Sequence, residues 1–203
     1  MKVIITIALA YLLGCFSSAY ILGKITKNID IREYGSGNAG ATNAYRVMGK
    51  KIGALTFILD ILKGVVAVTI GNYLLGFDGG LLAGIFVVLG HNFPVFLNFK
   101  GGKGVATSFE VLMMTNWKVG LICLIVGVTV ILLTKYVSLG SISASIAAPI
   151  VTSIVIDNVD KNYYLTICFL ALLASNAPLI AIFALSVPEP VNIISLGSLA
   201  PRR

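Results

Sequence analysis

Long apolar stretches alternate along the chain with short polar segments that hold most of its charge. Each apolar stretch approaches or exceeds the roughly 20 residues that an α-helix needs to cross a bilayer. The stretches cover 3–23, 52–75, 81–99, 108–134, 137–156 and 162–187. Asn116, Trp117 and Lys118 interrupt the fourth stretch and predict two short helices there. The pattern therefore predicts an all-α, polytopic membrane bundle with about seven transmembrane helices.

The composition agrees with an integral membrane protein. Of the 203 residues, 58% are hydrophobic and 11% are charged, and the mean hydropathy is +0.98. These values are far more apolar than those of a soluble domain. We expect residues 1–187 to form a single transmembrane domain and residues 188–203 to form an atypical C-terminal tail. The first stretch has no convincing small-residue cleavage site, so we interpret it as a retained helix.

The basic residues predict the orientation of the bundle. They gather at 24–51, at 100–103 and at 135, whereas the connections at 76–80 and 157–162 are short and acidic or mixed. By the positive-inside rule the basic segments face the cytoplasm, which places the N-terminus outside. The net charge of +7 draws this face toward anionic membrane lipid and does not indicate nucleic acid.

The first basic segment contains a glycine-rich motif, GSGNAGATN at 35–43, with Arg46 behind it. Glycine permits backbone geometry that is closed to other residues, and a guanidinium matches the shape of a phosphate. The motif also supplies short polar side chains, among them Ser36, Asn38 and Asn43. We expect this segment to bind an oxyanion. The alternative is a polar, glycine-rich loop that only begins a helix.

A second glycine-rich segment surrounds Lys103. Consecutive backbone N–H groups can form an anion-binding nest there, and the following helix adds its dipole. The phosphate-binding candidates are Lys100, Gly101, Gly102, Lys103, Gly104 and Thr107. The nucleotide-binding P-loop pattern is not met, because Leu97 and Gly104 occupy two of its defining positions. The alternative role for the lysines is to anchor the helix end at the membrane surface.

Three ionisable residues lie within or at the end of apolar stretches. Asp60 and Lys63 are three residues apart, hence on one helical face, and either pair with each other or contact substrate. The single histidine, His91, could cap a helix, hydrogen-bond a loop or act as a base, and we favour the structural role. The sequence shows no spacing typical of a metal site, and we expect neither a metal nor a cofactor.

Four segments resemble, in order, the motifs of the bacterial acyl-phosphate:glycerol-3-phosphate acyltransferases, the PlsY family. They are residues 35–46, LDILKG at 59–64, GHNFPVFLNFKGGKGVAT at 90–107 and YVSLGSI at 136–142, and the resemblance covers about 1–175. It implies transfer of a fatty acyl group from acyl phosphate to the 1-hydroxyl of glycerol 3-phosphate, giving lysophosphatidic acid and phosphate at the bacterial cytoplasmic membrane. It also implies that Ser36, Arg46 and Lys103 are catalytic and that Ser141 binds substrate.

Two alternatives remain. The family ends its last helix with a His-Arg-x-Asn-Ile-type motif, but this pattern is lost from about Ala177 and no histidine follows His91. The chain could thus be a catalytically impaired family member. It could also be a small transporter or channel for an anionic metabolite. A transporter would spread polar residues through several spans, whereas here they cluster at one face apart from Asp60 and Lys63, which favours an interfacial enzyme.

Overall fold

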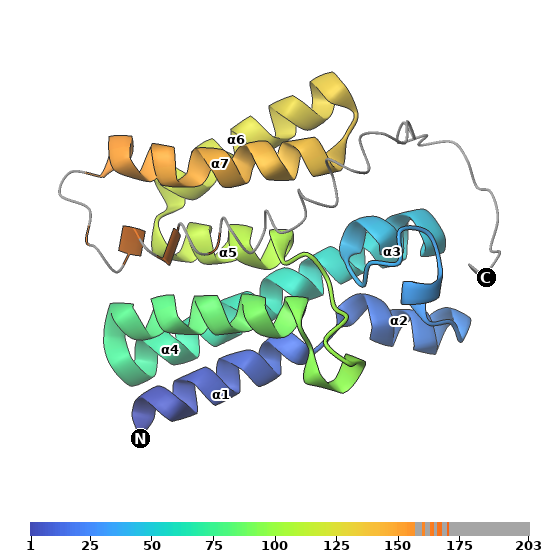
Figure 1. Cartoon of the computed structure of the whole chain (residues 1–203), viewed down its shortest axis with the longest axis horizontal. Coiled ribbons are helices and arrows are strands. Elements are labelled where there is room, and N and C mark those ends of the chain that lie inside the picture. The colour runs from blue at the N-terminus through green and yellow to red at the C-terminus, as the bar shows by residue number, and fades with distance from the viewer. Residues whose placement is uncertain (157–159, 161–162, 165, 168–169, 171–203) are drawn as a thin grey trace.

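The computed structural model describes residues 1–156, 160, 163–164, 166–167 and 170. Every regular element in this part of the chain is helical, which confirms the predicted all-α membrane fold. The elements are α1 (Lys2–Cys15), α2 (Ser18–Lys27), η1 (Ile31–Glu33), α3 (Ala41–Met48), α4 (Lys50–Asn92), η2 (Val95–Leu97), α5 (Val105–Thr115), α6 (Trp117–Thr134) and α7 (Val137–Val155). Figure 1 shows them as two layers, with α6 and α7 above α1 and α4 and with α5 between.

Four helical segments are long and apolar enough to cross a membrane: Lys2–Lys27, Lys50–Leu97, Trp117–Thr134 and Val137–Val155. The second of them has 48 residues, more than twice the roughly 20 required. Gly76, with φ 68° and ψ −158°, folds α4 back into two arms that lie side by side. These arms correspond to the predicted spans at 52–75 and 81–99, but the second arm ends at Asn92, so residues 93–99 do not continue the helix as the sequence predicted. The total of seven spans stays a prediction, since most of 162–187 and the whole tail at 188–203 lie outside the described residues.

The predicted break in the fourth apolar stretch is confirmed. Helix α5 ends at Thr115, and the Oδ1 of Asn116 accepts hydrogen bonds from the N–H groups of Lys118 and Val119 at 3.1 and 3.3 Å. A side chain that satisfies the first N–H groups of a helix in this way is an N-cap and fixes where that helix begins. Helix α6, with 18 residues, is longer than expected and is itself a candidate span.

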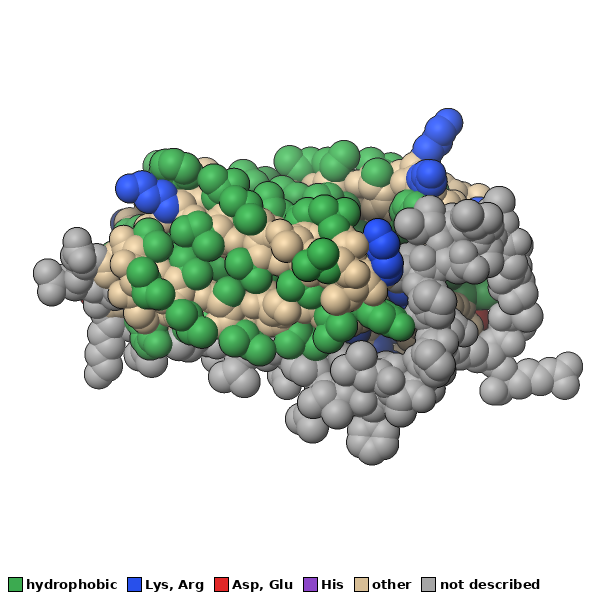
Figure 2. Space-filling view, turned by 90° about the horizontal axis from the view of Figure 1, so that it is seen from above, with side chains coloured by type: hydrophobic (Ala, Val, Ile, Leu, Met, Phe, Trp, Pro, Cys, Tyr) green, Lys and Arg blue, Asp and Glu red, His purple; other side chains and the backbone are tan. Residues whose placement is uncertain are grey.

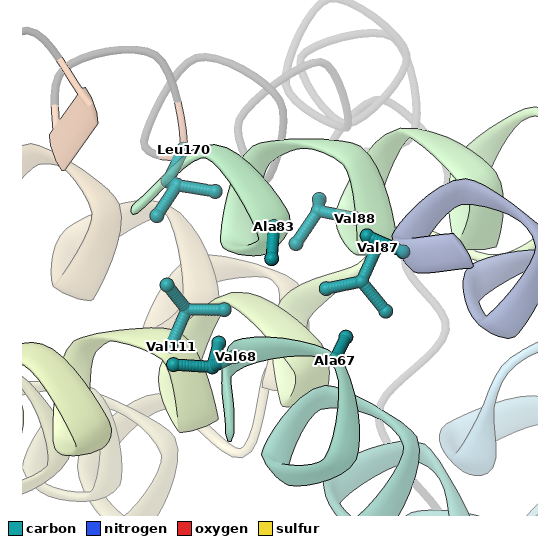
Figure 3. Close-up of a cluster of buried hydrophobic side chains, with 8 residues drawn as sticks. Ala67, Val68, Ala83, Val87, Val88, Val111 and Leu170 are labelled. Carbon is teal, nitrogen blue, oxygen red and sulfur yellow. The ribbon is translucent and has the colours of Figure 1, made fainter. Parts of the chain in front are cut away.

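Small residues form the contacts between helices. A Cβ atom on Gly14 of α1 would collide with the backbone of the second arm of α4, and one on Gly71 would collide with the backbone near Gly79. Such positions let backbones approach closely, which is how helices pack when lipid removes the hydrophobic driving force. The central hydrophobic cluster uses alanine and valine, with one leucine. Figure 3 shows most of its members, which are Ala10, Ala67, Val68, Ala83, Val87, Val88, Val111 and Leu170.

Large hydrophobic side chains face outward. Figure 2 shows them over the flank of the bundle, with lysine and arginine side chains toward the ends of the described part. An exposed apolar flank bounded by basic ends is the surface that a bilayer requires. The fold therefore places its polar loops, with α2 and α3, at one end of the helices (Figure 1).

We expect that end to face the cytoplasm. After replacement of Cys15, Cys123 and Cys168, single cysteines from Asn38→Cys and Lys100→Cys should react only with membrane-permeant thiol reagents in intact cells. A cysteine from Asp78→Cys, in the turn between the arms of α4, should react with impermeant reagents as well. Permeabilised cells, in which all three should react, provide the control. Labelling of Asn38→Cys by an impermeant reagent in intact cells would contradict the predicted orientation.

Candidate functional site

The glycine-rich motif at 35–43 is a loop organised by Asn43. The Asn43 side chain is 2% exposed, and its Oδ1 accepts a hydrogen bond from the Ser36 N–H at 2.8 Å. Its Nδ2 donates toward three carbonyl oxygens at 3.0–3.1 Å, those of Ile31, Tyr34 and Asn38. Both polar atoms of the amide are thus used inside the loop. The Asn43 side chain therefore shapes the loop that presents other residues, and its contribution to substrate binding stays a prediction.

Other residues of the motif remain accessible. Ser36 and Arg46 are exposed and Asn38 is partly exposed. Gly35 and Gly37 have φ values of 59° and 73°, in the left-handed region that glycine tolerates best. The predicted need for glycine is therefore met at these two positions. The loop displays the Ser36 hydroxyl, and α3 displays the Arg46 guanidinium on an exposed face.

The second glycine-rich segment packs tightly on the end of α4. The N–H groups of Gly101 and Gly102 donate to the carbonyl oxygens of Asn92 and His91 at 3.1 and 3.0 Å. A Cβ atom at Gly102 would collide with the imidazole of His91. Both N–H groups are thus paired within the protein in this structure, and the phosphate nest at Gly101 and Gly102 stays a prediction. Gly104, with φ 68°, instead begins α5 in a left-handed conformation.

Two predicted hydroxyl contacts also have partners within the protein. Thr107 is fully buried, and its Oγ1 donates to the carbonyl of Asp60 at 3.4 Å, which links α5 to α4. Its role in binding phosphate stays a prediction. The Ser141 Oγ donates to the carbonyl of Val137 at 2.9 Å within the first turns of α7. Ser141 is partly exposed, and its contribution to substrate binding stays a prediction.

Arg46 and Lys103 are brought together from segments far apart in sequence. The Ala39 N–H donates to the Gly101 carbonyl at 3.4 Å and joins the two glycine loops. The pKa of Lys103 lies below the ordinary lysine value because burial disfavours the ammonium and because Arg46 repels it. Lys100 is exposed beside them. Within the part of the chain that the structure describes, no carboxylate pairs with either cation, and two cations held close in this way favour an anionic ligand that bridges them.

A charged cluster lies buried beneath these loops. Lys63, 6% exposed, forms an ion pair with Asp60, 2% exposed, at 2.9 Å, so the predicted intramembrane pair is present. The Ser18 hydroxyl donates to Asp60 at 2.9 Å, and the Lys63 ammonium donates to the Phe16 carbonyl at 2.9 Å. Lys63 also lies 2.7 Å from the Nδ1 of His91. The cluster joins the break between α1 and α2 to both arms of α4.

His91 connects this cluster to the second glycine loop. Its Nδ1 faces the Lys63 ammonium, which can only donate, so Nδ1 accepts and the ring proton of the neutral imidazole belongs on Nε2. The opposite edge of the ring lies against Gly102, one residue before Lys103. The observed contacts thus give His91 a structural environment, in agreement with the role favoured from sequence, and make its ring the support on which the loop rests.

Arg32 is a structural residue of this end that the sequence analysis did not single out. Its guanidinium pairs with Asp30 at 2.7 Å and donates from Nη1 to the Leu97 carbonyl at 2.9 Å. The guanidinium also lies over the Tyr20 ring. The hydrogen bond from Arg32 lowers the pKa of the Asp30 carboxyl. The sequence does place an acidic residue two positions before Arg32, which could have indicated the ion pair. It does not reveal the contact with Leu97.

Comparisons with known proteins identify the family. The family model described as glycerol-3-phosphate acyltransferase matches residues 4–186. The chain belongs to the glycerol-3-phosphate acyltransferase family. A glycerol-3-phosphate acyltransferase of Thermoanaerobacter sp. (strain X514) is 58% identical over 154 residues, which are 76% of this chain and 78% of the relative. One from Clostridioides difficile (strain 630) is 50% identical over 153 residues, 72% of this chain and 75% of that protein.

Solved structures of the same family agree with this assignment. One is the crystal structure of PlsY (YgiH), an integral membrane glycerol 3-phosphate acyltransferase, in its glycerol 3-phosphate form. Its TM-score is 0.87 at 33% identity, and the match covers 96% of this chain and 98% of the PlsY chain. The lysophosphatidic acid form has a TM-score of 0.83 at 35% identity, over 92% of each chain. The resemblance expected from the four motifs is confirmed.

The buried ion pair should couple strongly in the folded acyltransferase. Lys63→Met leaves the Asp60 carboxylate uncompensated and should lower the free energy of unfolding by about 3–5 kcal/mol. The double variant Asp60→Asn with Lys63→Met should lose less than the sum of the two single variants. Equilibrium unfolding in detergent or bicelles measures all three. Strictly additive losses would contradict a direct interaction between the two side chains.

A methyl group at Gly102 should displace the loop that carries Lys103. Gly102→Ala places a Cβ against the His91 ring, so the KM for glycerol 3-phosphate should rise roughly tenfold to a hundredfold while the melting temperature changes little. Gly84→Ala is the matched control, since its Cβ meets the Val111 side chain in the core. That variant should melt lower with an unchanged KM. If Gly102→Ala behaved like the control, the glycine would serve packing alone.

Proposed function

We propose that this member of the acyltransferase family transfers a fatty acyl group from acyl phosphate to the sn-1 hydroxyl of glycerol 3-phosphate. The products are lysophosphatidic acid and inorganic phosphate, and the reaction serves phospholipid synthesis. The site faces the cytoplasm at the bacterial cytoplasmic membrane. The observation that carries the proposal is the convergence of Arg46 and Lys103 at one end of an apolar bundle, with no carboxylate of the described residues paired to either. Both substrates carry a phosphate group, and a pair of cations can bind such a group.

The relatives support the choice of acceptor. The solved PlsY structures are described in a glycerol 3-phosphate form and a lysophosphatidic acid form, which are the acceptor and the product of the proposed reaction. The acyl chain of the donor can stay in lipid while its phosphate reaches the loops. Lysophosphatidic acid, with one chain and one phosphate, can leave in the same manner.

The reaction requires the two substrates to be positioned and the charge on their phosphate groups to be stabilised. The acceptor hydroxyl oxygen attacks the acyl carbonyl carbon, the bond from that carbon to the phosphate oxygen breaks, and the electron pair leaves with phosphate. An acyl phosphate is a mixed anhydride, so its leaving group is already a stable anion. We assign the hydroxyl proton to a substrate phosphate. The alternative base, His91, has its Nδ1 turned toward Lys63 in the buried cluster and is poorly placed for proton transfer.

In this proposal Ser36, Arg46 and Lys103 carry the reaction. Arg46 and Lys103 neutralise the phosphate groups of donor and acceptor, and the exposed Ser36 hydroxyl donates a hydrogen bond to one of them. Asn38, Lys100 and Ser141, each at least partly exposed, complete the binding set. No cofactor takes part in any of these steps.

An assay with the purified protein tests the identity of the acyl donor directly. In nanodiscs it should form lysophosphatidic acid from glycerol 3-phosphate and acyl phosphate, with one phosphate released per product, and should not use acyl-CoA. Mass spectrometry detects the lipid and a colorimetric assay the phosphate. Turnover with acyl-CoA alone would overturn the donor assignment. Binding of glycerol 3-phosphate without turnover would indicate the impaired family member, and uptake of glycerol 3-phosphate into proteoliposomes without acylation would indicate the transporter.

Removing either cation should impair the reaction. Arg46→Ala and Lys103→Ala each delete a charge-assisted contact to phosphate, a loss of about 2–3 kcal/mol or roughly 30- to 150-fold in kcat/KM. Lys118→Ala removes the same charge from an exposed site at the start of α6, away from the glycine loops, and should leave kcat/KM unchanged. Kinetics like those of the wild type from Arg46→Ala or Lys103→Ala would refute the assignment.

A further inference from the structure

Residues 93–99, here called the aromatic loop, carry a patch of exposed hydrophobic side chains beside the proposed site. The loop follows the end of α4 at Asn92 and includes η2. Four of its hydrophobic side chains are exposed: Phe93 by 43%, Val95 by 44%, Phe96 by 73% and Phe99 by 59%. Exposed apolar residues on a membrane-spanning helix face the lipid chains, but these four lie on a loop at the polar end of the bundle (Figure 1).

The rest of the loop is fixed to the protein, so the outward side chains are not those of a loose segment. Pro94 and Leu97 are buried. The Tyr11 hydroxyl donates to the Phe93 carbonyl at 2.8 Å, and the Arg32 Nη1 donates to the Leu97 carbonyl at 2.9 Å. The N–H groups of Leu97 and Phe99 both donate to the Pro94 carbonyl at 3.0 Å.

The backbone itself holds Phe99 outward. Asn98 and Phe99 have φ values of 53° and 59°. Asparagine adopts this left-handed conformation with little difficulty, but a bulky residue such as phenylalanine rarely does. The loop keeps Phe99 in this conformation and leaves the residue 59% exposed, and an apolar environment would suit its ring.

The charges around the loop indicate what that environment is. The exposed Lys100 follows directly, and the exposed Lys24 and Lys27 lie on α2 at the same end of the bundle (Figure 1). Aromatic side chains next to lysines are typical of the boundary between headgroups and acyl chains, where rings enter the chains and ammonium groups meet lipid phosphates. A phospholipid surface therefore fits both the apolar and the cationic part of this patch.

We propose that the aromatic loop inserts into the headgroup region of the bilayer and admits the membrane-borne acyl donor to the site formed by Arg46 and Lys103. This inference rests on the proposed function. Only Lys100 and two glycines separate Phe99 from Lys103. A donor whose chain lies beside the Phe96 and Phe99 rings can thus present its phosphate to Lys103 without leaving the lipid.

Donor chain length separates this role from a role in folding. In nanodiscs, Phe96→Ser should lower kcat/KM about fivefold with a long-chain acyl phosphate and leave it unchanged with a short-chain, water-soluble one. Tyr73→Ser is the matched control, since Tyr73 is exposed by 88% near the turn between the arms of α4. That variant should leave both values unchanged. Equal losses of Phe96→Ser with both donors, or no loss with either, would overturn the proposal.

Fluorescence tests insertion without relying on activity. Trp117 is the only tryptophan, so Phe96→Trp combined with Trp117→Phe gives a single probe on the loop. Phospholipids brominated near the headgroup end of the acyl chain should quench this probe more strongly than those brominated near the terminal methyl. Absence of quenching by either lipid would contradict insertion. If the wild-type protein transfers an acyl group from neither the long-chain nor the short-chain donor, the proposed function is refuted. The quenching measurement would then still show whether the loop inserts into the bilayer.

Discussion

The buried ion pair between Asp60 and Lys63 is the interaction on which this end of the molecule depends. A charge in the membrane interior is costly unless a partner neutralises it, and each of these two groups has several partners. Those partners come from the link between α1 and α2 and from the second arm of α4. Satisfying one pair of charges therefore fixes three segments relative to one another, and through His91 it also fixes the second glycine loop.

The architecture separates buried residues that hold the loops from exposed residues that we propose bind the substrates. Asn43, Thr107 and His91 are buried and have polar partners within the protein. Ser36 and Arg46 are exposed at the same end, and Lys103 is partly exposed. This division lets the loops keep two repelling cations close, because the loop backbones are held by hydrogen bonds that involve neither cation. An anion bound between the two cations, as proposed above, would relieve their repulsion.

The sequence was informative wherever a local rule decides the structure. The spacing of Asp60 and Lys63 placed them on one face of a helix, and the interruption at 116–118 marked the junction where Asn116 caps α6. The four motifs, at their spacing, were sufficient for the family. Each of these inferences depends on residues close in sequence or on a pattern extended along the whole chain.

Sequence reasoning did not show which polar atoms are paired once the loops are folded, whether the partner is a few residues away or far along the chain. Asn43 resembles a ligand-binding amide until its three carbonyl partners are known, and the N–H groups of Gly101 and Gly102 appear available until the end of α4 is placed against them. Composition reveals the supply of donors and acceptors but not which of them are already paired. The contact of Arg32 with Leu97, across 65 residues, is another example.

The glycine contacts between helices have a thermodynamic consequence. Where Gly14 meets the second arm of α4, and where Gly71 meets Gly79, the buried surface is mostly backbone. Glycine has no side-chain rotamers to lose, so helix association at these contacts incurs almost no side-chain entropy penalty. Dispersion between closely packed backbones then needs to offset only the loss of rigid-body freedom of helices already inserted in the bilayer. Assembly of the bundle can thus proceed from contacts that would be too weak to fold a chain of this length in water.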